Sequence, residues 1–259
     1  MLRGFIVGSG YTVGMQTTYI YGRHAVKTLI ERQPQRVQGV FVSITAEREF
    51  APLCKAAHIR LELLAEHDFR KELEGAVHQG VVAKVAMDGL AQEYDRFIRE
   101  LEATPSTCLV LLNEITDPHN VGAIIRSAAA FGAAGVLLPA HNQAPITGAV
   151  AKASAGTVFS IPIIAINNEN QTIRDLKERR FWTYGLAAEG KNELSKEAFD
   201  APVVFVIGSE GDGLRAKTRE HCDILLRIPM HSRVESLNAS VSAAVVLAEW
   251  LKQHPEAIR

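Results

Sequence analysis

The sequence lacks several features that would by themselves assign the protein to a class, such as membrane, disulfide-rich or metal-binding proteins. No apolar run approaches the ~20 residues of a membrane-spanning helix, so the sequence predicts none. Three cysteines, Cys54, Cys108 and Cys222, are too far apart for a zinc knuckle or a CxxC redox pair, which favours a reducing, cytoplasmic setting. The nine histidines lack metal-ligand spacing, so we expect no metal. A formal net charge of -1 argues against coating nucleic acid by bulk electrostatics, but a local basic face stays open.

The composition that is present is that of an ordinary globular protein. With 259 residues, 47% hydrophobic and 22% charged, the chain is long enough for two small domains or one large one. We expect a disordered tail over 1–18, with Met15 as an alternative start, and a weakly basic α/β domain over 19–86. An acidic linker without a strand pattern follows over 87–106, and a larger domain occupies 107–259.

Alternating helices and strands are predicted in the small domain. A turn at Tyr21 to His24 leads into a helix that carries Val26, Leu29 and Ile30. Strands are expected over 39–43 and 60–64, helices over 50–57 and 69–73, and a turn around His78 that leads into a last strand. Within the linker we expect part of 94–102 to be helical.

An open parallel sheet is predicted for the larger domain. The apolar run CLVLLNEI has the character of a strand buried on both faces, and further strands are expected over 135–138, 158–164, 181–185, 203–207 and 224–228. A long final helix begins at about Ser240, with an apolar stripe at Val241, Ala244, Val245, Ala248 and Leu251. Because helices separate these strands, ligands are expected at the carboxyl ends of the strands. We find no internal repeat and no low-complexity tract.

Three loops at the ends of predicted strands contain short polar side chains or glycines. Taken singly, each is explained by a helix cap or a turn that needs positive φ. Together they favour a binding site. The residues in question are Asn120 and Arg126 after the first strand, Gly208, Glu210 and Gly211 after another, and Ser236 and Asn238 before the final helix.

Two competing motifs are weak. The glycines at 208, 211 and 213 do not form GxGxxG, and no acidic residue follows at the distance that a dinucleotide site requires. The run GLAAEGK is followed by Asn192 where a phosphate-binding loop needs Ser or Thr. Neither a nicotinamide nor a nucleoside triphosphate site is therefore predicted.

Several ordered segments resemble one known family. Three are similar, in order and spacing, to the signature motifs of the SpoU (TrmH) family of RNA ribose 2'-O-methyltransferases: NEITDPHNVGAIIRSAAAFGA, FVIGSEGDGL and IPMHSRVESLNASVSAA. Two more, YGRHAV and GAVHQG, resemble the substrate-binding domain of the subgroup that methylates guanosine in bacterial 23S rRNA. The resemblance covers nearly everything from Tyr19 onward. It implies a small N-terminal RNA-binding α/β domain and a C-terminal α/β-knot domain, a mainly parallel sheet with a trefoil knot.

The resemblance also implies a cofactor and a site. S-adenosylmethionine would be held by the backbone around Gly208, Ile228 and Leu237, with Gly211 and Met230 beside them. The catalytic set implied is Arg126, Glu210, Asn120, Ser236 and Asn238. Such enzymes are usually homodimers, and the apolar helix ending in Trp250 and Leu251 is the candidate contact.

Transfer of a methyl group to a ribose hydroxyl needs an in-line approach, a proton acceptor and a fixed sugar. In the family Arg126 is assigned to act on the hydroxyl. Because a guanidinium keeps its proton at ordinary pH, gripping a phosphate or stabilising the alkoxide demands less of Arg126 than acting as a base. Glu210 either takes the proton or orients Arg126. The remaining three side chains position the ribose, the phosphate and the neighbouring loops.

The small domain is expected to select the RNA. Structured RNA is recognised by shape and by splayed bases, so a weak net charge is compatible with contacts from Arg23, His24, Arg36, His78 and Gln79. The implied substrate is 23S rRNA or a large-subunit precursor, methylated at a guanosine of the peptidyl-transferase P loop. We expect deletion of 19–86 to leave cofactor binding intact.

Two alternatives stay open. In the first alternative, the chain is a tRNA ribose or resistance-type rRNA methyltransferase of the same fold, because only the small N-terminal domain distinguishes these enzymes. In the second alternative, the chain is a non-catalytic RNA-binding protein whose methyl-transfer site has decayed. The presence of four expected site residues argues against this alternative: Arg126, Glu210, Ser236 and Asn238.

Overall fold

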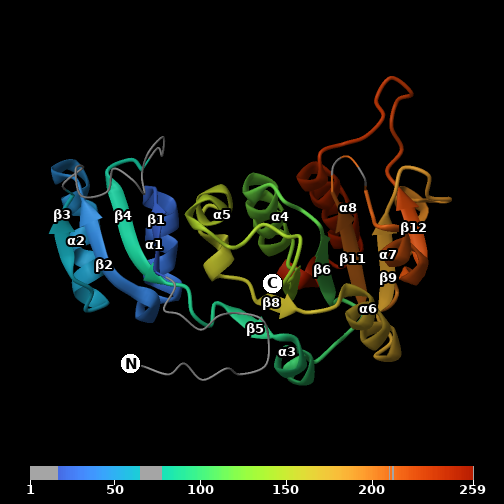
Figure 1. The fold of residues 1–259 in the computed structure, drawn as a ribbon, viewed down its shortest axis with the longest axis horizontal. Helices are drawn as coiled ribbons and strands as arrows, with labels where there is room; N and C mark the ends of the chain where they lie inside the picture. The colour runs from blue at the N-terminus through green and yellow to red at the C-terminus, as the bar shows by residue number, and fades with distance from the viewer. Residues whose placement is uncertain (1–16, 65–77, 210, 212, 259) are drawn as a thin grey trace.

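A computed structural model describes residues 17–64, 78–209, 211 and 213–258. The chain forms a four-stranded sheet near its N-terminus and an eight-stranded sheet from the rest, and Figure 1 shows the two sheets at opposite ends of an elongated molecule. Within the described ranges, no helix is long and apolar enough to cross a membrane.

The small sheet has the order β1-β4-β2-β3. It comprises β1 (Thr17–Tyr21), β2 (Val37–Val42), β3 (Leu61–Leu63) and β4 (Val81–Ala86), with helices α1 (Arg23–Arg32) and α2 (Ile44–Ala56). The helical stripe of α1 is buried as its spacing predicts, since Val26 and Leu29 are fully covered. The antiparallel pair β1 and β4 places Tyr21 opposite Val82. This sheet is the small α/β unit that the alternating pattern predicts.

Two boundaries in this region differ from the prediction. The tail expected over 1–18 is wrong for Thr17 and Thr18, which form the first residues of β1 because β4 supplies their pairing partners. Helix α2 begins at Ile44, well before the predicted start at 50, since Ser43 with extended backbone already serves as its N-cap residue. The helix predicted over 69–73 lies outside the described residues.

The large sheet is parallel throughout, as predicted, with the order β10-β12-β9-β11-β6-β7-β8-β5. Every residue of the central β6 is buried, which explains its unbroken apolar run. The strands are β5 (Ala91–Glu93), β6 (Cys108–Asn113), β7 (Gly135–Pro139), β8 (Ile163–Ile166), β9 (Trp182–Leu186), β10 (Asn192–Glu193), β11 (Val203–Gly208) and β12 (Ile224–Arg227).

Helices cover both faces of the large sheet. One core cluster contains Val110 of β6 together with buried residues of α4 (Pro118–Ala130), α5 (Gly148–Ala153) and α8 (Ala239–Gln253). A second contains Leu111 of the same strand with buried residues of α3 (Tyr94–Glu100) and α6 (Glu169–Glu178). Alternate residues of β6 therefore point to opposite layers. The short α7 (Ala216–His221) packs beside α6.

The segment between the two sheets is not a plain linker. Its predicted helix is present as α3, but β5 precedes it and pairs with β8 at the edge of the large sheet. All three residues of β5 are exposed, so the sequence carries no apolar signal for a strand there. The strand predicted over 158–164 is also partly wrong, because Thr157–Phe159 forms a 3-10 turn and β8 begins only at Ile163.

The fully buried face of α8 is not the apolar stripe of Val241, Ala244, Val245, Ala248 and Leu251. Ala243, Val246 and Leu247 are fully buried, whereas Val241 is 45% exposed and Val245 is 37% exposed. Trp250 is fully buried, so this side chain is not the surface contact that was expected of it. Both faces of the helix are apolar, and spacing alone does not tell which of them meets the sheet.

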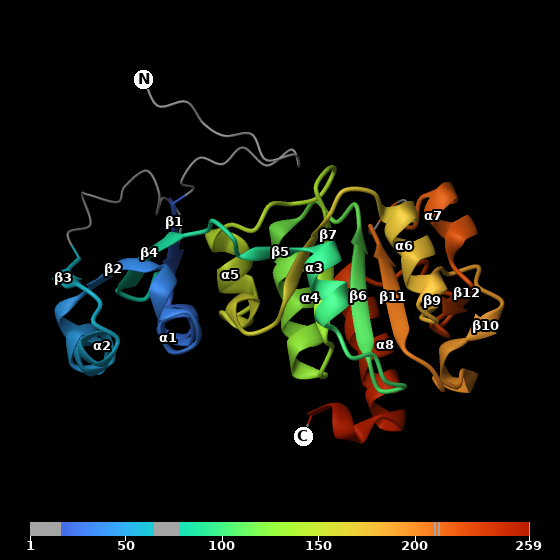
Figure 2. The same cartoon turned by 90° about the horizontal axis from the view of Figure 1, so that it is seen from below.

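Close backbone contacts join the small sheet to α5. A Cβ on Gly148 would collide with the carbonyl oxygen of Tyr19 in β1, and a Cβ on Gly156 would lie 3.0 Å from Cα of Ala25 in α1. Gln33 also donates a hydrogen bond to the carbonyl of Phe159, at 2.9 Å. In Figures 1 and 2, α5 lies between α1 and α4. The two sheets thus share one packed core rather than being joined only by a chain segment.

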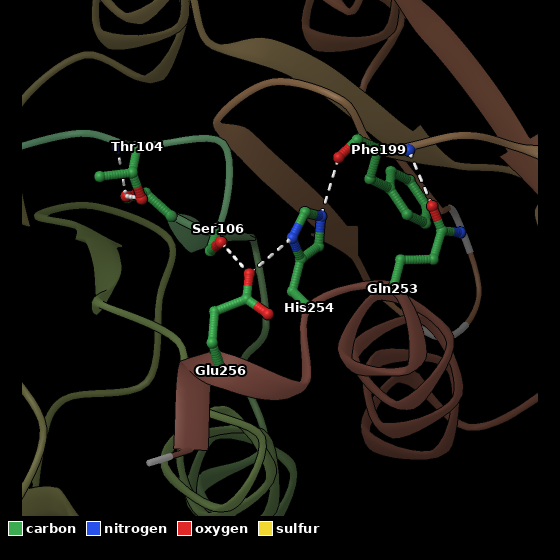
Figure 3. A network of polar contacts seen from close by, with 7 residues as sticks. Thr104, Ser106, Phe199, Gln253, His254 and Glu256 are labelled. Carbon is green, nitrogen blue, oxygen red and sulfur yellow. Dashed lines mark hydrogen bonds and ion pairs between the residues drawn. The ribbon is translucent and has the colours of Figure 1, made fainter.

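A network of polar contacts fixes the C-terminal end of α8 (Figure 3). The imidazole Nε2 of His254 lies 2.8 Å from the carbonyl oxygen of Phe199, whose amide donates to the side chain of Gln253 at 3.1 Å. Glu256 accepts a hydrogen bond from the hydroxyl of Ser106, which holds the pKa of this carboxyl below its usual range. His254 is 8% exposed. These bonds tie the last helix to the segments before β6 and β11.

Replacement of His254 by alanine is expected to lower the free energy of unfolding by about 1–3 kcal/mol. The substitution removes the buried partner of the Phe199 carbonyl and the ring contact with Trp250. Urea denaturation measures the change, with Lys252→Ala on the exposed side of α8 as the control. Equal stability of the two variants would show that the network of Figure 3 adds nothing.

Candidate active site at the carboxyl end of the large sheet

A cavity of about 320 Å³ opens at the carboxyl ends of β9, β11 and β12. The sequence expectation for the cofactor names five positions, and all five line this cavity: Gly208, Gly211, Ile228, Met230 and Leu237. They come from two separate loops, one after β11 and one between β12 and α8. The fold therefore gathers into one concave site residues that are up to 29 positions apart in sequence.

The turn after β11 requires glycine. Ser209 and Gly213 exchange two backbone hydrogen bonds of 3.2 and 3.1 Å, which fold the loop back on itself. A Cβ on Gly208 would collide with the carbonyl of Gly213 and lie 2.7 Å from the amide nitrogen of Leu214. Gly213 itself has φ of 64°, where a side chain is strained. The backbone can line the cavity only because these positions have no side chain.

The walls of the cavity are apolar and its rim is polar. Leu186, Ile207 and Leu226 line it beside Ile228 and Leu237, whereas Glu189, Glu235 and Ser236 supply carboxylates and a hydroxyl. Glu189 forms an ion pair with Arg219. Flat apolar walls suit an aromatic base, and polar groups near the rim suit the charged part of a ligand.

The contribution of the loop after β9 was missed in the sequence analysis. Residues 186–189 line the cavity, although no site residue was expected there. A signal existed, because this loop also follows the carboxyl end of a predicted strand. It was overlooked because Ala187 and Ala188 have no polar side chain, and such residues line a ligand site with their backbone.

Two of the expected catalytic residues meet beside the cavity. The side-chain amide of Asn238 donates to Oδ1 of Asn120 at 3.0 Å, which joins the first turns of α4 and α8. Oδ1 of Asn238 accepts from the amides of Ser240 and Val241, so the same residue also caps α8. Asp117 caps α4 by accepting from the amide of His119 at 2.9 Å. The asparagine pair fixes how the two helix N-termini face each other.

The other expected catalytic residues lie apart or cannot be placed. Arg126 is exposed on α4 and has no hydrogen-bond or ion-pair partner in the part of the chain that the structure describes. Ser236 is exposed and lines the cavity. Glu210 lies outside the described residues. The structure thus brings Ser236 to the cavity and Asn120 to Asn238, whereas Arg126 projects to solvent from α4.

Substitutions at Asn238 separate its two roles. Asn238→Ala removes both the cap and the bond to Asn120, and is expected to cost about 1–2 kcal/mol in the free energy of unfolding. Asn238→Asp keeps an acceptor for the cap but loses the amide donor, so it is expected to retain most of the stability and to lose activity. Thermal melts and methyl-transfer rates of both variants test this. An active Asn238→Asp variant would contradict a role for the Asn120 bond.

Four of the five expected RNA-binding residues gather at one end of β4. The amide of Arg23 donates to the side chain of Gln79 at 3.2 Å, and its guanidinium forms a 2.9 Å ion pair with Glu49. Nδ1 of His78 accepts from the amide of Gly80 at 3.1 Å, and His24 is exposed on α1. These residues form one surface at the entry of α1, as the shared turn character of their segments predicts.

Arg36 does not belong to that surface. Its guanidinium donates to the carbonyls of Asp88 and Gly89, each at 2.6 Å, and burial lowers its pKa. The carbonyls lie just beyond the far end of β4, roughly 20 Å along the strand from Gln79. The guanidinium of Arg36 thus holds the segment that leaves the small sheet, and a contact between Arg36 and RNA stays a prediction.

Among the described residues, no group of three or more His, Cys, Asp or Glu side chains is arranged to hold a metal ion.

Comparisons with known proteins identify the family of the chain. The SpoU rRNA Methylase family model matches residues 107–248, and the model for RNA 2'-O ribose methyltransferase substrate binding matches 19–89. The 23S rRNA (guanosine-2'-O-)-methyltransferase RlmB of Yersinia pestis is 39% identical over 90% of this chain and 96% of its own length. The same enzyme of Photorhabdus laumondii is 40% identical over 90% and 97%.

A solved structure has the same fold. The SpoU methyltransferase AviRb from Streptomyces viridochromogenes, in complex with the cofactor AdoMet, aligns with a TM-score of 0.76 and 26% identity over 92% of this chain and 91% of that one. The family match covers more than half of the chain, and the relatives match over nearly their whole length. The chain belongs to the SpoU rRNA methylase family.

Proposed function

We propose that this protein transfers a methyl group from S-adenosylmethionine to the ribose 2'-hydroxyl of a guanosine in 23S rRNA. The observation that carries the proposal is the cavity at the carboxyl ends of β9, β11 and β12, which all five expected cofactor positions line. The relatives that match nearly end to end carry the name of this reaction, which supports the substrate.

The cavity fits the cofactor. The absence of a Cβ at Gly208 lets the backbone of Gly213 and Leu214 close the turn, which then lines the cavity with main-chain groups that a ligand can contact. Ile228 and Leu237 offer apolar surface for an adenine, and the acidic Glu235 at the rim suits a ligand with a sulfonium and an ammonium charge. The cofactor supplies the activated methyl group, so the protein has to position the hydroxyl and manage one proton.

The residues of the chain divide this task. The bonded pair Asn120 and Asn238 orients the N-termini of α4 and α8 toward the ribose and the neighbouring phosphate. The guanidinium of Arg126, which has no partner among the described residues, suits an RNA phosphate or the alkoxide that develops on the hydroxyl. Ser236 lines the cavity and positions the sugar. Glu210 either accepts the proton of the hydroxyl or orients Arg126.

The small domain selects the RNA through the surface formed by Arg23, His24, His78 and Gln79. The domain model for substrate binding that matches 19–89 supports this assignment. Two of these side chains, His24 and Gln79, are exposed and can reach unstacked bases or ribose hydroxyls. The target belongs to the peptidyl-transferase P loop, on naked RNA or on a precursor of the large subunit, in the cytoplasm.

Two finer features of the fold belong to the same proposal. We infer a trefoil knot at the C-terminus: β12 lies toward one edge of the sheet, whereas α8 returns to pack on α4 and β11 near its middle. An experimental structure traced through 228–238 tests the path. We also infer a homodimer in which a second copy covers the exposed apolar face of α8, namely Val241 and Val245.

Val245→Arg is expected to convert the dimer to a monomer without loss of secondary structure, because an exposed apolar residue is replaced by a charge. Light scattering after gel filtration measures the mass, and Lys252→Glu on the same helix is the control. A wild-type protein that elutes as a monomer at micromolar concentration would contradict the dimer.

Methyl transfer tests the function directly. Labelled S-adenosylmethionine is incubated with 23S rRNA and with bulk tRNA from cells that lack the enzyme, and nucleosides are then analysed by mass spectrometry. We expect 2'-O-methylguanosine from 23S rRNA alone. Label in tRNA alone would overturn the substrate, and no label in either RNA or in ribosomal precursors would favour the non-catalytic alternative.

A further inference from the structure

A second cavity, of about 410 Å³, lies beside the first at the carboxyl ends of β7 and β8. Leu214 lines the first cavity and the next residue, Arg215, lines the second. The amide of Arg215 donates to Asn113 at 3.1 Å, and Asn113 pairs in register with Gly208. The end of β6 and the backbone at 214–215 therefore lie between the two cavities. A ligand in the second would be a direct neighbour of the cofactor site.

Two of the four Glu, Arg and Lys side chains that line the second cavity are paired with each other. Arg215 and Glu114 form an ion pair in which Nε lies 2.5 Å from Oε2, and this pairing helps to hold Glu114 at an unusual φ of 59°. Asn168 accepts from the amide of Gln171 and caps α6. These residues have evident structural roles.

Two groups of opposite charge in this cavity still have atoms that can bind a ligand. Oε2 of Glu169 accepts from the side chains of Asn113 and Thr218, but Oε1 has no hydrogen-bond partner among the described residues. Lys217 is exposed, and in the same described ranges its ammonium has no carboxylate partner. Burial raises the pKa of Glu169, although its two hydrogen bonds oppose the shift. The second carboxylate oxygen of Glu169 is therefore open to a hydrogen-bond donor from a ligand in the cavity.

The chemistry of these two groups matches one kind of nucleotide. Guanine has two adjacent donors, N1–H and the 2-amino group, on one edge. Adenine and cytosine have an acceptor beside their amino group, and uracil has a single N–H between two carbonyls. An acceptor oxygen at the end of Glu169 can take both adjacent donors of guanine, but only one N–H donor from each of the other three bases, and Lys217 suits a phosphate. Pro139 adds an apolar surface on the same wall.

We propose that the second cavity binds the guanine base of one unstacked RNA nucleotide, with Glu169 reading the N1–H and 2-amino edge and Lys217 facing a phosphate. The inference rests on the proposed function, because it takes RNA as the substrate. It adds a base-reading site within the methyltransferase domain, apart from the surface of the small domain. A cavity of about 410 Å³ has room for a single splayed base.

Calorimetric titration of the full-length protein with mononucleotides tests the proposal. The first cavity is saturated beforehand with S-adenosylhomocysteine, so that the nucleotides report on the second. We expect 5'-GMP to bind about tenfold more tightly than 5'-AMP, and 5'-IMP, which lacks the 2-amino group, to fall between them. Equal affinities, or no binding of 5'-GMP at millimolar concentration, would overturn the proposal.

Glu169→Gln is expected to abolish the preference for GMP, because an amide oriented by Asn113 and Thr218 no longer offers a carboxylate oxygen to both donors. Glu178→Gln, the same change at the exposed last residue of α6, is the matched control. If Glu169 only ties α6 to β6, the variant is less stable but keeps the preference, which would refute the role in base reading.

Lys217→Ala provides a test that does not depend on the folding of the Glu169 variant. It is expected to weaken binding of 5'-GMP several-fold while leaving binding of neutral guanosine unchanged, since only the phosphate contact is lost. A parallel loss for both ligands would contradict the assigned phosphate contact. Methyl transfer to 23S rRNA is measured separately. Methyl transfer without a preference for GMP over AMP would contradict this inference alone. A preference for GMP without methyl transfer would contradict only the proposed function.

Discussion

Arg126→Lys is expected to reduce the rate of methyl transfer by about a hundredfold to a thousandfold while leaving the affinity for S-adenosylmethionine unchanged. Arg126 is exposed on α4 and makes no ion pair or hydrogen bond with any described residue, so the fold does not depend on it. A lysine keeps the charge but loses the planar, two-pronged donor that a phosphate or a developing alkoxide would accept from. The loss of one such donor typically has this magnitude.

Single-turnover methyl transfer, calorimetric binding of S-adenosylhomocysteine and thermal melts together decide the matter. The control is Arg174→Lys, an exposed arginine on α6 with no assigned role. A variant at Arg126 that melts early would point to a structural role. Full activity of Arg126→Lys would show that charge alone is sufficient there.

Gly208→Ala is expected to abolish measurable cofactor binding and to lower the free energy of unfolding by about 1–3 kcal/mol. The added methyl would meet the backbone of Gly213 and Leu214, which cannot move aside as a flexible side chain can. The two bonds between Ser209 and Gly213 would break, and the turn that lines the cavity would open.

Gly211→Ala is the matched control for stability, because a Cβ at Gly211 meets no atom within 4 Å. Both glycines line the same cavity, but only Gly208 is enclosed by backbone. Chemical denaturation should therefore separate the two variants, and calorimetry should report binding in each. Equal stabilities would show that the turn can rearrange at little cost.

The periodic parts of the fold could be read from the sequence. The buried run of β6 and the helical stripe of α1 have one dominant pattern each, and the structure confirms both. The three polar loops could also be found, because the carboxyl ends of parallel strands meet at one edge. Elements that depend on a distant partner could not be read: β5 is exposed and polar, and only its pairing with β8 makes it a strand.

Side-chain roles were harder to predict than elements. Arg36 has a side chain of the kind that contacts RNA, yet its guanidinium donates hydrogen bonds to backbone carbonyls that follow β4. The face of α8 that meets the core could not be read from the sequence, because valine and alanine occur on both sides of the helix. Glu169 could not be recognised as a site residue from the sequence, because it is an ordinary first residue of a helix after Asn168.

The contacts of Gly148 and Gly156 with β1 and α1 bear on how the molecule unfolds. Buried residues of the small sheet, such as Ile20 and Leu29, belong to the same core cluster as Val150 and Trp250. Loss of 19–86 would strip apolar cover from α5, which itself supports α4 and the asparagine pair. We therefore expect a single melting transition. This replaces the expectation from the sequence that deletion of 19–86 leaves cofactor binding intact: the deletion should lose cofactor binding through loss of folding rather than through loss of any contact to the ligand.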